Sequence, residues 1–236
     1  MTGGIDHLLV VVPARDEAEL LGRQLTAVAS AVRYAAWLRP RTTVSTTVVL
    51  DSCTDVSAGV AAGFADVHAV EAELGSVGLT RRLGVAEARA RHAPGDELDP
   101  ASTWVACTDA DSVVPHDWLS GQLDLAATGS RLVLGTVWPD PAELEAARLR
   151  HWWARHHLRD GHPYVHGANL GFALDAYDLV GGFRGLPVGE DVDLVERMRA
   201  VGVAWTATSR IPVLTSSRLG GRTPAGFASY LMALLP

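Results

Sequence analysis

The sequence predicts a single-domain α/β fold, and three observations support that prediction. The chain has 236 residues, which is the length of one domain of ordinary size. Short runs rich in Val and Leu alternate with longer stretches of helical periodicity, a pattern typical of a parallel sheet flanked by helices. Hydrophobic residues make up 48% of the chain and charged residues 20%, a composition that indicates a globular protein with a substantial core.

The first half of the chain shows this alternation most clearly. Residues 7–13 form a continuous apolar run, as expected of a buried parallel strand. Helical periodicity follows over 16–38, where the apolar stripe consists of Leu21, Leu25, Val28, Val32 and Ala35. Asp55 is placed to cap the next helix. We expect further strands at 44–50, 67–70 and 104–108, further helices at 56–64 and 78–91, and a polar loop at 92–102.

The second half has shorter elements and more glycine. We expect strands at 131–137, 203–207 and 211–214, a short extended segment at 172–174, and helices at 115–127, 141–158, 190–201 and 223–235. No repeat or low-complexity linker divides the chain, so this half is expected to form a smaller lobe on the same sheet.

Charge and cysteine content exclude several classes of function. The net charge of −7 makes a nucleic acid an unsuitable partner. All 20 basic residues are Arg, which excludes both a Schiff-base lysine and a P-loop lysine. Cys53 and Cys107 are too few for a disulfide framework, so we expect a reduced, cytoplasmic protein.

The sequence also shapes what is expected at a membrane. The N-terminal segment has no basic region and only a short apolar run, so we expect no signal peptide. No stretch of about 18 apolar residues is present, so no transmembrane segment is expected. The apolar residues 230–236 are too few to cross a bilayer but leave peripheral membrane contact open.

Acidic or polar clusters follow three of the predicted strands, at residues 14–17, 51–55 and 109–111. The carboxyl ends of parallel strands form the ligand-binding edge of an open sheet, so these clusters are expected to meet there. The chain has neither a GxGxxG after its first strand nor a GxxxxGK[ST], so it lacks both glycine-rich phosphate cradles. A divalent cation held by Asp109 and Asp111 would offer another means of binding a phosphate.

Six segments in order carry a family resemblance. They are VVVPARDEAELL (10–21), VVLDSCTDVSA (48–58), GLTRRLGVAEA (78–88), VACTDADSVVPHDWL (105–119), HGANLGFALDAYDLVGGF (166–183) and GEDVDLVERM (189–198). With them the chain resembles glycosyltransferase family 2, over about residues 8–218. The resemblance implies the GT-A fold, a Rossmann-like architecture with a central, mostly parallel sheet flanked by helices and a smaller acceptor-side lobe.

The first three segments are similar to the part of that family that binds the nucleotide. The resemblance implies that the base and ribose are held by Pro13, Ala14, Arg15 and Glu17. Asp16 stands where the family more often has Asn. Asp51 is implied to contact the base, and either Arg81 or Arg82 to lie beside the diphosphate.

The fourth segment resembles the DxD motif. It implies that Asp109 and Asp111, with Ala110 between them, bind the diphosphate through Mg²⁺ or Mn²⁺, and that Asp111 is the more direct metal ligand. Such an ion would neutralise charge on the departing nucleoside diphosphate.

The last two segments resemble the catalytic part of the family. Asn169 is implied to lie near the donor sugar and the acceptor. Asp191 matches the catalytic base, which would remove the proton from an acceptor hydroxyl, and Glu190 would orient Asp191 or contact the acceptor. The helix dipole alone also favours acids in a first helical turn.

One departure from the family bears on the product. The QxxRW motif of processive synthases is absent, and the corresponding region carries Arg218 and Arg222 around two glycines. We therefore expect a non-processive enzyme that adds one sugar. An Arg guanidinium grips phosphate oxygens well, so we expect this loop to be mobile and to close over the donor diphosphate.

The prediction is thus a metal-dependent, inverting glycosyltransferase that moves one sugar from a nucleotide-sugar donor to a hydroxyl acceptor. A UDP-sugar is favoured over a GDP-sugar. Residues 1–236 would form one domain, with a nucleotide-binding half of about 1–112 and an acceptor and catalytic half of about 113–236. Two alternatives stay open: a nucleotidyltransferase that makes a nucleotide sugar, and a non-catalytic nucleotide-sugar-binding module.

Overall fold

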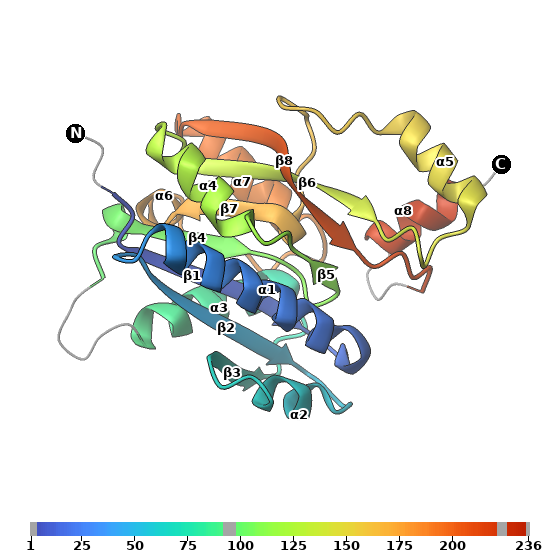
Figure 1. Ribbon diagram of the computed structural model, residues 1–236, viewed down its shortest axis with the longest axis horizontal. Helices are drawn as coiled ribbons and strands as arrows, with labels where there is room; N and C mark the ends of the chain where they lie inside the picture. Colours follow the sequence, from blue (N-terminus) through green and yellow to red (C-terminus); the bar gives the residue numbers. More distant parts are fainter. Residues whose placement is uncertain (1–3, 92–97, 221–225, 235–236) are drawn as a thin grey trace.

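The computed structural model describes residues 4–91, 98–220 and 226–234, whose strands form one eight-stranded sheet (Figure 1). The strand order is β3-β2-β1-β4-β7-β6-β8-β5. The strands are β1 (His7–Ala14), β2 (Thr43–Asp51), β3 (Val67–Ala72), β4 (Thr103–Cys107), β5 (Ser112–Val113), β6 (Leu132–Pro139), β7 (Leu170–Ala173) and β8 (Trp205–Thr215).

Helices cover both faces of this sheet. They are α1 (Ala18–Leu38), α2 (Ser57–Ala62), α3 (Val77–Arg91), α4 (Trp118–Ala127), α5 (Ala146–Arg155), α6 (Leu174–Leu179), α7 (Glu190–Ala200) and α8 (Phe227–Ala233). Short 3₁₀ turns occupy Pro100–Ser102 and Gly167–Asn169. Figure 1 shows α1 and α4 on one face and α3, α6 and α7 on the other.

The sheet is mixed. Four strand pairs are parallel, namely β1 with β2, β1 with β4, β2 with β3, and β6 with β8. The other three pairs are antiparallel, because β7 runs opposite to both β4 and β6, and β5 runs opposite to β8. The N-terminal half is therefore the parallel sheet that the sequence predicts, and the antiparallel pairs come from the second half.

Side-chain size determines how closely the helices pack on this sheet. On α1, Leu21, Leu25 and Val28 are buried, as the helical spacing predicts. Helix α3 approaches the sheet through Gly84, where a Cβ atom would lie 2.5 Å from Cγ1 of Val11. This close contact places the start of α3 beside the carboxyl ends of β1 and β2.

Helices α5 and α8 form a separate small unit beside the ends of β6 and β8 (Figure 1). Their contact buries Leu144, Trp152, Leu231 and Leu234 in a cluster distinct from the main core. Arg148 on α5 donates hydrogen bonds to the carbonyls of Leu231, at 2.8 Å, and Met232, at 3.1 Å, and so joins the two helices.

Three predicted elements differ in the structure. The strands expected at 203–207 and 211–214 are one strand, β8, because its pairing with β6 jumps from Thr208 to Val213 across an irregularity. The helix expected over 141–158 is limited to α5. The terminal helix is described as α8, and α6 and β5 are elements that periodicity did not reveal. Among the described residues, no helix is both long and apolar enough to cross a membrane.

Candidate active site

The carboxyl ends of β1, β2 and β4 open into a cavity of about 740 Å³. This is the edge at which an open parallel sheet presents its ligand site. The starts of α3, α7 and α8 complete the walls. The three acidic or polar clusters expected to meet at this edge contribute Glu17, Asp51, Asp109 and Asp111 to the lining.

The loop after β1 places Pro13, Ala14, Arg15 and Glu17 along the cavity. Asp16 turns away from them, in a left-handed conformation with φ of 47°. Its carboxylate accepts a hydrogen bond from the backbone N–H of Thr54 at 2.6 Å, which holds the pKa of Asp16 below its usual value. Asp16 therefore ties the loop after β1 to the loop after β2. Asn, which is common at this position in the family that the chain resembles, tolerates the same conformation.

Asp51, at the end of β2, is 4% exposed and organises the next loop. Its Oδ1 accepts hydrogen bonds from the N–H groups of Leu74, at 2.6 Å, and Gly75, at 3.0 Å. Its Oδ2 accepts a third from Thr80 Oγ1 at 2.9 Å. Burial raises the pKa of Asp51, but these donors outweigh it, and the net shift is downward. The carboxylate lines the cavity while it fixes the loop before α3.

Arg81 and Arg82 lie on different sides of α3. Arg81 lines the cavity, its side chain is 3% exposed, and its guanidinium bridges Asp109, at 2.5 Å, and Glu190. Arg82 is exposed and donates to the carbonyl of Phe183 at 3.4 Å. Burial disfavours the charged form of Arg81, but Asp109 and Glu190 outweigh this and raise its pKa. The structure thus answers which of the two arginines faces the site.

The Asp109-Ala110-Asp111 segment follows β4 and lies on the cavity floor. Burial, reinforced by the charge of Asp109, raises the pKa of Asp111 to about 6. Asp111 Oδ2 lies 3.1 Å from a guanidinium nitrogen of Arg218. Carboxylate oxygens are the ligands that Mg²⁺ and Mn²⁺ prefer, and the lining of this cavity supplies those of Asp109 and Asp111. The residues present therefore fit a divalent cation.

Arg218 is held in place rather than free. It donates to both carboxylate oxygens of Glu17, one of them at 2.7 Å, as well as to Asp111. The segment before it is anchored to Glu143, which accepts from Ser216 Oγ at 2.7 Å and from Ser217 N–H at 2.8 Å. The predicted closure of this loop over the donor diphosphate stays a prediction. Arg222 lies outside the described residues.

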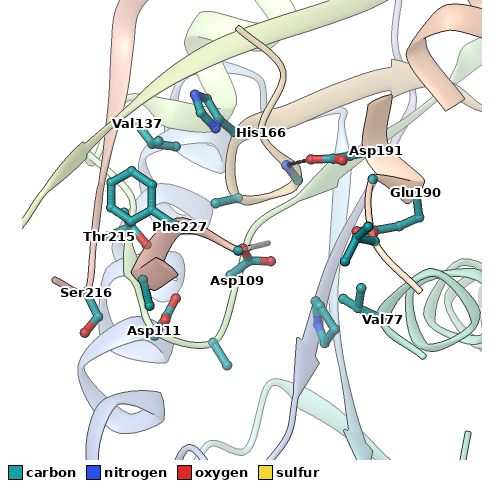
Figure 2. A pocket seen from close by; sticks show the side chains of 18 of the residues that line it. Val77, Asp109, Asp111, Val137, His166, Glu190, Asp191, Thr215, Ser216 and Phe227 are labelled. Atoms are coloured by element: carbon teal, nitrogen blue, oxygen red, sulfur yellow. Dashed lines mark hydrogen bonds between the residues drawn. The ribbon is translucent and has the colours of Figure 1, made fainter. Parts of the chain in front are cut away.

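The start of α7 presents two acids to the cavity. Gly189 precedes the helix with φ of 74°, a conformation that suits glycine. Asp191 Oδ2 accepts a hydrogen bond from the N–H of Gly167 at 2.7 Å, which orients the carboxylate. Figure 2 shows Glu190 and Asp191 on one side of the cavity, facing Phe227 and Thr215 across Asp109. The third first-turn acid, Asp193, pairs with Arg197 instead.

Asn169 has a structural position. It is 1% exposed, and its amide nitrogen donates to the carbonyls of Thr136, at 2.9 Å, and Ile211, at 2.8 Å. Its amide oxygen accepts from the indole of Trp118 at 2.9 Å. The cavity lining includes Gly167 and Ala168 but not Asn169. Asn169 thus joins β6, β8 and α4 beneath the site, in contrast to the expected contact with the donor.

The structure adds aromatic residues that the sequence motifs did not reveal. They line the same cavity and include Tyr164, Phe227 and Tyr230. None belongs to a motif, and α8 meets the cavity only through the fold. His166, whose role the sequence left open, also lines this part. Burial lowers the pKa of His166 to about 4, so its ring is neutral at pH 7.

Comparison with known proteins settles the family. Residues 9–184 match the family described as glycosyl transferase family 2. The chain belongs to glycosyl transferase family 2. No curated protein sequence matches the chain.

Solved structures show that this family 2 chain has the GT-A fold. Residues 1–349 of S. aureus TarS with UDP-GlcNAc match at a TM-score of 0.66 and 14% identity, over 96% of this chain and 64% of TarS 1–349. GalNAc-T7 with UDP, GalNAc and Mn²⁺ matches at a TM-score of 0.64 and 11% identity, over 93% of this chain and 45% of GalNAc-T7. A mannosyltransferase from Pyrobaculum calidifontis with GDP-Man and Mn²⁺ matches at a TM-score of 0.56 and 21% identity, over 89% of this chain and 56% of the mannosyltransferase. The chain thus spans less than two thirds of each of these proteins.

Proposed function

We propose that this family 2 chain is an inverting glycosyltransferase that moves one sugar from a nucleotide-sugar donor to an acceptor hydroxyl. The observation that carries the proposal is the cavity itself, which brings Asp109, Asp111 and Asp191 into one space (Figure 2). Solved proteins of the same fold were crystallised with UDP-GlcNAc, UDP or GDP-Man, which supports a nucleotide-sugar donor. We favour UDP over GDP.

In this proposal the chain's residues divide the chemistry between them. The loop after β1 binds the nucleoside, with Arg15 at the cavity wall. Asp111 and Asp109 would hold Mg²⁺ or Mn²⁺, which when bound supplies positive charge to the diphosphate. Arg218 is already beside Asp111 and would take a share of the diphosphate charge. Arg81 positions both Asp109 and Glu190 through its two ion pairs.

Asp191 is the proposed general base. Its Oδ2 is oriented by the Gly167 N–H, and its carboxylate faces the cavity. It takes the proton of the acceptor hydroxyl while that oxygen forms a bond to the anomeric carbon of the donor. The bond from that carbon to the diphosphate oxygen breaks, and the nucleoside diphosphate leaves with the electron pair. A single displacement from the opposite face inverts the anomeric configuration.

The cellular location is part of the same proposal. Cys53 and Cys107 are both unpaired in the structure. Free thiols fit a reducing compartment, so we place the protein in the cytoplasm.

The test is turnover of UDP- and GDP-sugars with Mn²⁺ and simple sugar acceptors, followed by release of nucleoside diphosphate. Asp191→Asn keeps the size of the side chain and removes the proton acceptor, so transfer should fall at least about 100-fold while UDP binding is unchanged. Asp193→Asn is the matched control in the same helical turn, because Asp193 pairs with Arg197. Full transfer by the Asp191 variant would move the base to another residue.

A further inference from the structure

The cavity is divided into a charged part and an aromatic part. All the Asp, Glu and Arg side chains that line it come from the end of β2, from the segments after β1, β4 and β8, and from the starts of α3 and α7. The lining also includes six aromatic side chains. We call these rings the aromatic wall: Trp152, His156, Tyr164, His166, Phe227 and Tyr230.

The rings of this wall contact one another. Trp152 and His156 stack with centroids 4.4 Å apart and planes 7° apart. His156 lies 5.5 Å from the ring of Tyr164 and meets Tyr230 edge-on at 5.4 Å. Such ring pairs restrict one another's orientation, so the wall is arranged before any ligand binds.

The helices that carry the wall also have an independent support. Trp152 and Leu231 lie in the small cluster between α5 and α8, apart from the main core. Tyr230 is 39% exposed although it lines the cavity, so its ring contributes little to that cluster. Its ring meets His156 edge-on and also lines the cavity, where it is accessible to a ligand.

None of the six residues of the wall is an Asp, Glu or Arg. Among the described lining residues, the Asp191 carboxylate lies beside the wall, because it acts on His166 electrostatically and accepts from the neighbouring Gly167 N–H. Arg155 acts on Tyr230 electrostatically but is exposed and is not part of the lining. His156 donates through Nδ1 to the carbonyl of Trp152 at 2.9 Å, which leaves Nε2 as an acceptor in the neutral ring. The wall thus offers ring faces and a few hydrogen-bonding atoms to an uncharged molecule.

We propose that the aromatic wall is the acceptor subsite and that it binds an uncharged sugar ring. This inference rests on the proposed function, because the acceptor must present a hydroxyl to Asp191. Figure 2 shows Phe227 across the cavity from Asp191, so a molecule against this ring lies between the ring and the base. A pyranose ring combines apolar C–H faces, which pack on aromatic rings, with edge hydroxyls that reach the carboxylate.

The experiment uses the full chain with UDP and Mn²⁺ and four uncharged probes, the methyl glycosides of glucose, galactose, mannose and N-acetylglucosamine. Saturation-transfer NMR detects their binding, with glucuronate and benzyl alcohol as charged and non-sugar comparisons. UDP affinity is measured in the same samples. At least one methyl glycoside should bind wild type, and Tyr230→Ala should weaken it at least fivefold with UDP affinity unchanged.

Two variants separate the ring from the helix. Met232→Ala truncates a side chain on the same helix that is 51% exposed and does not line the cavity, so it should bind the glycosides like wild type. Tyr230→Phe keeps the ring face and should keep most of the binding.

Several results would overturn the inference. One is wild-type protein that binds UDP but none of the four glycosides. Others are equal binding by Tyr230→Ala and a preference for glucuronate or benzyl alcohol. Wild-type protein that binds neither UDP nor GDP would instead remove the proposed function, and the acceptor subsite with it.

Discussion

At the scale of single residues, the site depends on Arg81. Its side chain is almost fully buried, and it neutralises Glu190 and Asp109, which come from α7 and from the segment after β4. A buried charge left without its partner is costly, whereas a pair replaced together is often tolerated. The position of the DxD segment relative to α7 is therefore coupled to one guanidinium.

We predict that Arg81→Met lowers the free energy of unfolding by about 3–5 kcal/mol, because Glu190 stays buried without its partner. The double variant Arg81→Met/Glu190→Gln should be more stable than Arg81→Met alone. Urea unfolding at pH 7 measures both. A double variant that loses the sum of the two single losses would show that the two side chains do not interact.

His166 predicts a pH dependence of stability. Burial lowers its pKa from an ordinary 6.5 to about 4. As the pH falls, the imidazole therefore takes up a proton in the unfolded state before it does so in the folded state. The free energy of unfolding that the protein has above pH 6.5 decreases as the pH falls towards 4. At about 1.4 kcal/mol per pKa unit, the loss is about 3 kcal/mol at most.

The variant His166→Gln cannot take up that proton. Its free energy of unfolding, measured by urea at intervals from pH 7 to 4.5, should fall less steeply than that of wild type. His157→Gln changes a histidine that is exposed in the folded state, so this variant is the control and should follow wild type. Parallel curves for wild type and His166→Gln would contradict the burial of a neutral imidazole.

Residue patterns predicted much of the site, for a physical reason. Acids at the ends of parallel strands must share one edge, so Asp51, Asp109 and Asp111 could be brought together without a structure. The sequence pattern alone also allows Arg81, rather than Arg82, to be placed on the buried face of α3, because Arg81 is in helical phase with Val85 and Ala88. The position of Asn169 was not, since its partners lie far away in the sequence, on β6, β8 and α4.

At the scale of elements, the packing of α3 on the sheet sets one wall of the cavity. Gly84 allows α3 to lie directly on β1 and β2, and its added Cβ would meet Val11 Cγ1 at 2.5 Å and Val49 Cγ2 at 3.2 Å. The first contact is shorter than Cβ atoms tolerate and the second is tight, so a larger residue must displace either these valines or the helix. Thr80 and Arg81 would move with it.

Gly84→Ala should therefore destabilise the protein by about 1–3 kcal/mol, as overpacked cores do. Gly59→Ala is the matched control, since Gly59 is also helical and its Cβ would have no atom within 4 Å. Alanine at position 59 lowers the conformational entropy of the unfolded chain, which should raise the free energy of unfolding by about 0.4–1 kcal/mol. Urea unfolding of both variants decides, and a neutral Gly84→Ala would mean that α3 does not lie this close.

The predicted elements differed from the structure where long-range pairing overrides local pattern. The polar residues 208–210 suggested a break between two strands, yet β8 continues because an irregularity in its pairing with β6 absorbs them. Helix α8 was expected as a terminal helix, but nothing in its sequence indicated that it lines the cavity. Its place depends on α5, to which Arg148 and the shared apolar cluster attach it.

At the scale of the whole molecule, negative charge is gathered where a cation would serve. The chain carries a net charge of −7. Six carboxylate side chains line one cavity, and three arginines line it with them: Glu17, Asp51, Asp109, Asp111, Glu190 and Asp191, with Arg15, Arg81 and Arg218. A nucleoside diphosphate is itself an anion, so in the proposed function its binding would need further positive charge beside Asp109 and Asp111. We therefore predict that nucleotide binding depends on a metal ion.

Calorimetric titration of UDP and GDP into the protein tests that claim most directly, with Mn²⁺ and then with EDTA. We expect at least one nucleotide to bind with Mn²⁺ and to lose at least about tenfold in affinity, or 1.4 kcal/mol, in EDTA. Asp111→Asn should show a similar loss in the presence of Mn²⁺, whereas Asp66→Asn, at an exposed position away from the cavity, should bind like wild type. Equal affinity with Mn²⁺, with EDTA and in the Asp111 variant would contradict the claim.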